Sequence, residues 1–242
     1  MTSQTGAAFI DTDKPGGPRS RKGARTRARL LAAAKEIFEE SGFLDARISD
    51  IAERAGLSHG SFYHYFESKE EIFREVAEAV EEQLSAPMGS VILDPASDAP
   101  PRERIREGIR LHLESYRRHA RIMGVIEQVS RYDEGVKAAR ARRHRYYGQL
   151  LEQSIRRLQR RGQVDPGLDP VIAAAAVGSM TSRFPELWLV EGFLDCDFEA
   201  GVEQLTRVFV NALGLKDDTG APATGGMTTH AGHNPASYRR RR

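Results

Sequence analysis

Small or hydrogen-bonding side chains cluster between residues 59 and 64. His59, Ser61, Tyr63 and His64 lie close together, with Gly60 among them and no acidic residue in the segment. A helix that enters the major groove of DNA needs such a surface, because short residues permit close approach and polar tips meet base edges and phosphates. The segment therefore predicts a surface that reads DNA.

Other chemistries fit the sequence less well. His59 and His64 lack the spacing of a zinc site and have no third ligand nearby. The chain also shows no glycine-rich phosphate loop and no nucleophile motif. We therefore expect no enzymatic activity, no metal and no cofactor.

Two helices joined by a turn would position the DNA-reading side chains. Apolar residues recur at helical spacing from Ile48 onward and give a first helix one apolar face. Gly56 ends this helix, because glycine adopts the left-handed conformation without steric cost. Leu57 fills the angle, and Ser58 caps a second helix that ends near Tyr65. The alternative is an ordinary corner between two solvated helices.

Helices on either side complete the unit. Ser68 and Glu71 form a capping box that opens a helix with an apolar face up to Val80. Upstream, a helix over residues 25–41 is closed by Gly42. The last helix of the unit leads into the rest of the chain.

An ordered series of residues runs through this unit. Its members are Ile37-Phe38, Gly42-Phe43, Asp50-Ile51-Ala52, Ala55-Gly56-Leu57-Ser58, Gly60-Ser61-Phe62-Tyr63-His64-Tyr65-Phe66 and Ser68-Lys69-Glu70-Glu71. The series resembles the DNA-binding domain of the TetR family of bacterial transcriptional regulators, and it covers a quarter of the chain. The chain departs from that family at Ala46 and Arg47, where members commonly place Thr or Ser. We expect Asp45 or Ser49 to cap the helix that follows.

The resemblance implies a set of DNA-contacting residues. Tyr63 and Lys69 would contact phosphates, and Lys69 lies near the positive end of its helix. Arg47 would add a charged phosphate contact, whereas His59, Ser61 and His64 would meet base edges. The full predicted set is Arg47, Ser49, Ser58, His59, Gly60, Ser61, Tyr63, His64, Tyr65 and Lys69.

Charge is distributed unevenly along the 242 residues, whose formal net charge is +2. Residues 1–30 hold seven basic and two acidic residues, and five basic and two acidic residues follow from Lys216 onward, so the body between them is acidic. Such a body would touch nucleic acid only at chosen points. The basic arm either enters a minor groove or stays solvated. We expect a disordered arm (1–22), a DNA-binding domain (23–86), a helical ligand-binding and dimerisation domain (87–215) and a disordered tail (216–242).

The sequence offers no membrane partner. No apolar run reaches membrane-spanning length, and residues 1–13 do not form a secretory signal. The single cysteine forms no intrachain disulfide, as in a reducing compartment. We expect a cytoplasmic, nucleoid-associated bacterial protein.

The chain beyond Ala86 is predicted to be helical throughout, which makes the fold class all-α. Residues 94–101 read as a linker, and a long basic helix follows over residues 134–161. Its arginines indicate a solvated face that partners acidic residues, with a nucleic-acid patch as the alternative.

The last two helices are expected to pair with those of a second copy. Asp169 is expected to cap a helix that begins at Pro170. Residues 171–180 of this helix are small and nearly uncharged, and residues 198–213 carry an apolar stripe. The resemblance places a four-helix dimer interface here, whereas the alternative is the buried core of a monomer. The predicted interface set is Val171, Ala175, Gly178, Phe198, Val202, Leu205 and Phe209.

The resemblance also implies a ligand cavity in the second domain. The residues predicted to line it are Leu113, Tyr116, Met123, Ile126, Tyr147, Leu151, Arg183, Phe184 and Trp188, although packing explains each equally well. The near absence of buried charge favours an apolar or amphipathic effector, such as a lipid, a fatty acyl derivative, a steroid or a drug.

These patterns together predict a ligand-responsive homodimeric repressor. Two reading heads about 34 Å apart would bind a palindromic operator on double-stranded DNA, and a small effector would release them. The alternatives are a constitutive regulator and a non-specific architectural DNA-binding protein, neither of which has an effector.

Overall fold

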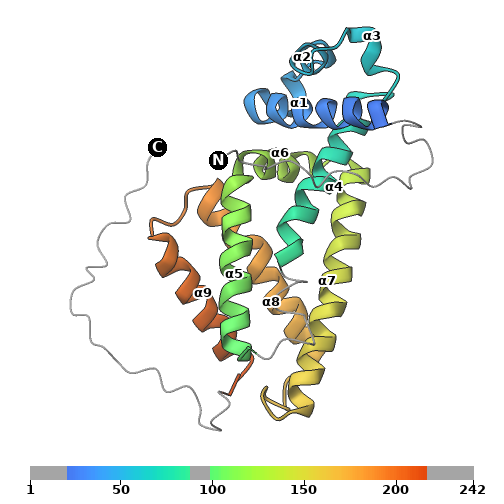
Figure 1. Cartoon of the computed structure of the whole chain (residues 1–242). Helices are drawn as coiled ribbons and strands as arrows, with labels where there is room; N and C mark the ends of the chain where they lie inside the picture. Colours follow the sequence, from blue (N-terminus) through green and yellow to red (C-terminus); the bar gives the residue numbers. More distant parts are fainter. Residues whose placement is uncertain (1–20, 88–98, 217–242) are drawn as a thin grey trace, which may run out of the picture.

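The regular elements of residues 21–87 and 99–216, which the computed structural model describes, are all helices (Figure 1). The predicted all-α fold is confirmed for this part of the chain. Most of the predicted arm, linker and tail lies outside these residues. The exceptions are the end of the arm, where the first helix begins at Arg21, the end of the linker, where a helix begins at Pro101, and Lys216 at the start of the tail.

The four N-terminal helices form a head at the top of the molecule (Figure 1). They are α1 (Arg21–Asp45), α2 (Ile48–Arg54), α3 (His59–Phe62) and α4 (Lys69–Pro87). Their apolar faces meet around fully buried aromatic rings, and the rings of Phe38 and Phe73 make an edge contact at 5.0 Å. Gly42 breaks α1 at a φ of 71°, which is where the sequence predicts its end.

The remaining helices form the body. They are α5 (Pro101–Arg118), α6 (Ala120–Ser130), α7 (Glu134–Arg160), α8 (Pro170–Pro185), the π-helical turn η2 (Glu186–Val190) and α9 (Phe198–Ala212). α7 packs on α8, and α5 packs on α9. The core between them includes Ile109, Leu113, Ile155, Val202 and Phe209.

Most predicted helix starts are confirmed by their caps. The Ser68 hydroxyl accepts the N–H of Glu71 at 3.1 Å, and the carboxylate of Asp169 accepts two N–H groups at the start of α8. The prediction that Asp45 or Ser49 caps α2 is wrong. The N-cap residue is Arg47, and its side chain makes no capping hydrogen bond. The Ser49 hydroxyl instead hydrogen-bonds the neighbouring Asp50 carboxylate.

The apolar core does not divide where the sequence suggests a domain boundary. Ile122, Ile126 and Val129 of α6 belong to the same buried cluster as the residues of α1 and α4. α6 also packs directly on α1. The head is therefore seated on α6, and α4 passes from the head into the body.

Gly201 on α9 permits close packing of a tryptophan. A Cβ at this position would lie 2.3 Å from an edge carbon of Trp188. We expect Gly201→Ala to lower the free energy of unfolding by about 1–3 kcal/mol, because the ring has to move within a packed core. Thermal or chemical denaturation monitored by circular dichroism would measure the change.

Gly148→Ala on α7 is the matched control, because a Cβ there meets nothing within 4 Å. It should raise stability by about 0.5–1 kcal/mol through helix propensity alone. Equal effects of the two substitutions would contradict the packing role of Gly201.

Candidate nucleic-acid interface and effector cavity

A serine cap and a glycine turn present α3 at the outer end of the head. Gly56 has a φ of 66°, and Ser58 accepts the N–H of Ser61 at 3.2 Å through its hydroxyl. The helix is shorter than predicted, because regular helix ends at Phe62 and turns follow to Tyr65. The predicted turn and its cap are otherwise confirmed.

The α3 segment exposes its polar residues and buries its aromatic anchors. His59, Gly60 and His64 are exposed, and Tyr63 is 50% exposed with its ring against that of His59. Phe62 and Phe66 are fully buried beneath them. The polar side chains therefore share the outer surface of the head. Their contacts with DNA remain a prediction.

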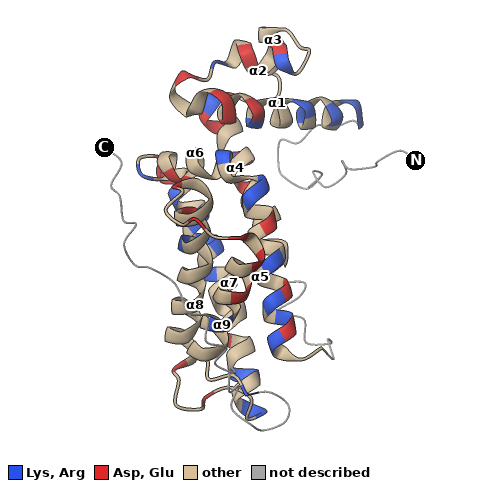
Figure 2. Ribbon diagram, turned by 90° about the vertical axis from the view of Figure 1, so that its left-hand side faces the viewer, with Lys and Arg blue, Asp and Glu red and all other residues tan. Residues whose placement is uncertain are grey.

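Arginines that the sequence analysis did not single out hold α2 and α3 in place. Arg54 of α2 pairs with Glu36 at 3.0 Å and with Glu40 at 2.8 Å, both on α1. Arg27 of α1 pairs with Glu75 of α4 and lies 4.7 Å above the Phe66 ring. The first turns of α1 are basic and its second half is acidic (Figure 2). The basic part therefore pairs with α4, and the acidic part pairs with α2.

Lys69 is engaged within the head. Its ammonium donates to the carbonyls of Phe43 at 2.8 Å, Leu44 at 3.1 Å and Ala46 at 2.9 Å, and lies 4.7 Å from the Phe43 ring centre. An ammonium has three protons, and three carbonyls already accept them. This geometry favours a role in positioning the link between α1 and α2 over the predicted phosphate contact.

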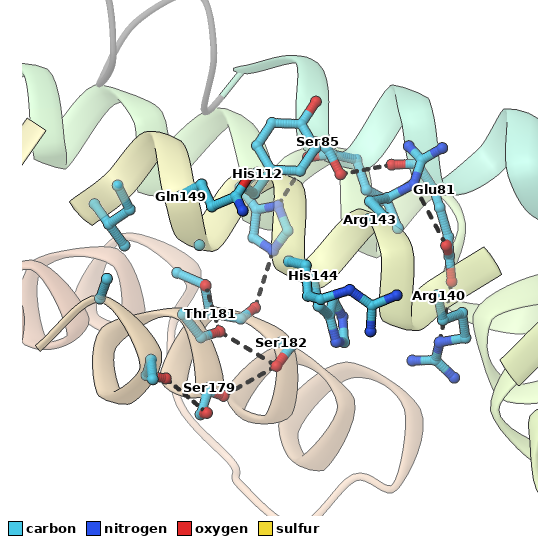
Figure 3. A pocket seen from close by; sticks show the side chains of 18 of the residues that line it. Glu81, Ser85, His112, Arg140, Arg143, His144, Gln149, Ser179, Thr181 and Ser182 are labelled. Carbon is cyan, nitrogen blue, oxygen red and sulfur yellow. Dashed lines mark hydrogen bonds and ion pairs between the residues drawn. The ribbon is translucent and has the colours of Figure 1, made fainter. Parts of the chain in front are cut away.

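A cavity of about 510 Å³ lies in the body between α4, α5, α7 and α8 (Figure 3). Of the residues predicted to line a ligand site, Tyr116, Met123, Tyr147 and Leu151 lie in its wall. Leu113 and Ile126 are not in this wall, since both are fully packed in the apolar cores.

The three remaining residues of that set also lie outside this cavity. Trp188 stacks on Phe198 and makes a tilted contact with Phe184, outside this cavity. Arg183 pairs with Glu186 at 2.6 Å and with Glu191 at 2.9 Å.

Buried charge is present at one end of the cavity, contrary to the sequence prediction. Glu81 of α4 is 8% exposed, and its carboxylate lies 3.0 Å from Arg140 and 3.6 Å from Arg143 of α7. Burial raises the pKa of Glu81, and the two arginines oppose that shift. Arg140 also pairs with Glu127, and Arg143 with Glu82. The predicted solvated arginine face is therefore partly an internal ion-pair network, which the basic run alone did not reveal.

The predicted dimer set divides into two groups. Val202, Leu205 and Phe209 are buried inside the chain's own core, because the apolar stripe of α9 packs on α5. The prediction is wrong for these three. Val171 and Ala175 are exposed, whereas Gly178 and Phe198 are half-buried.

Two family models match the chain. The model described as "Bacterial regulatory proteins, tetR family" matches residues 30–76, and the model described as "Tetracyclin repressor-like, C-terminal domain" matches residues 98–191. Together they span the head and most of the body. The chain belongs to the TetR family. Like its relatives, it is a DNA-binding transcriptional regulator and not an enzyme.

Relatives of this TetR-family protein are named as regulators. UidR of Escherichia coli K12 is 29% identical over 192 residues, which cover 79% of this chain and 89% of the relative. YdgC of Bacillus subtilis is 51% identical over 55 residues, which cover 23% of this chain and 28% of the relative. Identity is therefore high over a short segment and modest over the whole chain.

Solved structures share the fold. SmeT, the repressor of the multidrug efflux pump SmeDEF of Stenotrophomonas maltophilia, superposes with a TM-score of 0.64 at 24% identity, covering 82% of this chain and 94% of that chain. The fatty acid degradation regulator FadR of Bacillus halodurans gives a TM-score of 0.63 at 17% identity, covering 79% of this chain and 97% of that chain.

None of the helices in the described part of the chain has the length and apolar character needed to span a membrane.

Replacing Lys69 distinguishes a role in positioning the link between α1 and α2 from a contact with a DNA phosphate. We expect Lys69→Met to lower the free energy of unfolding by about 1–3 kcal/mol, because three carbonyls lose a charged donor. The slope of operator affinity against salt should not change. Denaturation and fluorescence anisotropy at several salt concentrations would test both. A salt slope lowered by about one unit, with unchanged stability, would support the predicted phosphate contact instead.

Proposed function

We propose that this protein is a homodimeric repressor, cytoplasmic and nucleoid-associated, that leaves a palindromic operator when a small effector fills the cavity. The observation that carries the proposal is the position of α4. Its apolar residues from Ile72 to Val80 lie in the core of the head, while Glu81, Leu84 and Ser85 lie in the cavity wall. A ligand that moves this helix also moves the head. The domain division predicted from the sequence is retained in this proposal, with α4 as the link.

The effector acts through differential affinity. The dimer has one spacing of its heads that fits DNA and another that does not, and the effector binds the second better. It shifts operator occupancy by that difference in affinity and no more. The cavity volume suits a drug-sized molecule.

A second copy is expected to cover the outer faces of α8 and α9. Ile172 is 71% exposed, Val171 53% and Val208 49%, and the exposed alanines 175 and 176 lie on the same helix as the first two. Large exposed apolar side chains of this kind are typical of an interface. Each subunit would then contribute one reading head, as a palindrome requires.

Selection of bound genomic fragments by the purified protein tests the DNA-binding half of the proposal. We expect one enriched palindrome with half-sites about one helical turn apart. His64→Ala should relax preference at one base pair by about 1–3 kcal/mol, since a base-edge contact is lost. Arg156→Ala, at the far end of α7, is the control and should leave the motif unchanged. Uniform enrichment that disappears with modest salt would support the architectural alternative instead.

A charge at the outer face of α8 tests the dimer. We expect Ile172→Glu to raise the dimer dissociation constant by at least about tenfold, because the carboxylate would be buried without a partner. Light scattering coupled to size exclusion would measure it. Tyr132→Ser is the control, since Tyr132 is a comparably exposed ring, 53%, that lies outside the proposed interface. A dimer unaffected by Ile172→Glu would place the interface elsewhere.

A further inference from the structure

The imidazole of His112 on α5 lies between two backbone carbonyls in the cavity wall. Its Nδ1 is 2.9 Å from the carbonyl oxygen of Leu84 on α4, and its Nε2 is 3.0 Å from that of Thr181 on α8 (Figure 3). A neutral imidazole has one N–H, so it donates to one oxygen and turns a lone pair toward the other. Only the imidazolium donates to both.

The carbonyl of Thr181 lacks its usual helical partner. Residue 185, four places beyond Thr181, is a proline and has no N–H to donate. Residue 87, four places beyond Gln83 on α4, is also a proline. The hydroxyl of Ser115, one turn along α5, likewise donates to the carbonyl of Gln83 at 3.3 Å. α5 therefore supplies donors to carbonyls in the last turns of α4. A neutral His112 has one N–H too few to donate to both of its carbonyls.

That proton is costly at this buried position. Burial lowers the pKa of His112, and the two carbonyl contacts offset this shift only in part. A counter-charge would favour the imidazolium. Both carboxylates of the wall are already engaged, since Glu81 faces two arginines and Glu152 pairs with Arg156 at 2.9 Å.

The other titratable groups of the wall come from α4, α5 and α7. α4 and α5 contribute Glu81 and Tyr116. α7 contributes Arg140, Arg143 and Arg145 together with His144, Tyr147 and Glu152. α8 contributes no charged residue to the wall. Arg140 and Arg143 are paired with Glu81, Glu127 and Glu82, so Arg145 is the arginine of the wall that makes no ion pair with the described residues. The rest is largely apolar, with Leu84, Met123, Leu151, Val171 and Ala174. This arrangement suits an amphipathic molecule with an acidic head.

We propose that the effector is an amphipathic weak acid, and that its monoanionic head supplies the counter-charge with which His112 takes up a proton. This inference rests on the proposed function, because it assigns a chemical class to the same cavity. The proton adds to the ring nitrogen that lacked one. The imidazolium then donates to the carbonyls of Leu84 and Thr181, and ties the end of α4 to α8. Acid binding is thereby linked to the helix that carries the head.

Calorimetric titration of the full chain with three probes of equal tail length tests this inference. The probes are decanoate, 1-decanol and decyltrimethylammonium, titrated at about pH 7.5, where a free histidine is largely neutral. Phosphate and Tris buffers differ in ionisation enthalpy, so their comparison gives the protons taken up. We expect decanoate to bind with uptake of about one proton per subunit, and decanol to bind without uptake. We expect decyltrimethylammonium to bind at least about tenfold more weakly than decanoate.

Two variants assign the proton. His112→Gln places two amide protons between the same carbonyls without a titrating group, so it should keep decanoate binding and lose the uptake. His144→Gln, the other histidine of the wall, is the control and should keep the uptake. If His112→Gln does not fold, the ring carbon signals of the wild-type histidines in nuclear magnetic resonance should show His112 becoming cationic on addition of decanoate.

Several outcomes would overturn the inference: uptake that persists in His112→Gln, tighter binding of the cationic probe, or no binding of decanoate. The proposed function fails separately, through absence of operator binding in the same protein sample without probe. Release of operator by decanol or by the cation, but not by decanoate, would retain the proposed function and reject the acid.

Discussion

The structure depends on α4 being buried along its whole length by two different sets of partners. Its first turns supply Ile72, Phe73 and Val76 to the core of the head, and its last turns face α5 and α7. A helix transmits displacement along its axis because its backbone hydrogen bonds keep it stiff. The head and the cavity therefore share one rigid element.

Polar contacts fix how α4 lies against the body. Arg74 pairs with Asp133 at 2.8 Å, and the same carboxylate caps the start of α7 through the N–H of Val136. Further along, Glu81 lies between two arginines of α7. Buried ion pairs add little net stability compared with apolar packing, but removing one partner leaves a costly charge. Such contacts specify one arrangement of the helices, which an effector in the cavity would have to change.

The end of the head that carries α3 is built in a different way. Here buried aromatic residues form a rigid base for exposed polar ones, with Phe62 and Phe66 beneath His59 and Tyr63. The turn before α3 is fixed by Gly56 and by the Ser58 cap. Lys69, Arg27 and Arg54 bind neighbouring helices to one another. A preorganised surface loses little conformational entropy when it binds.

The sequence alone determined the helices, the turn of the head and most caps, because these depend on residues a few positions apart. Gly56, Ser58, Ser68 and Asp169 act on their own neighbours and were correctly interpreted. The wall of the cavity and the inward stripe of α9 were decided only by tertiary packing, since an apolar residue on a helix has the same periodicity whether it faces a core, a cavity or a second subunit. The buried ion pairs were likewise hidden, because Glu81 and Arg140 lie far apart in the chain.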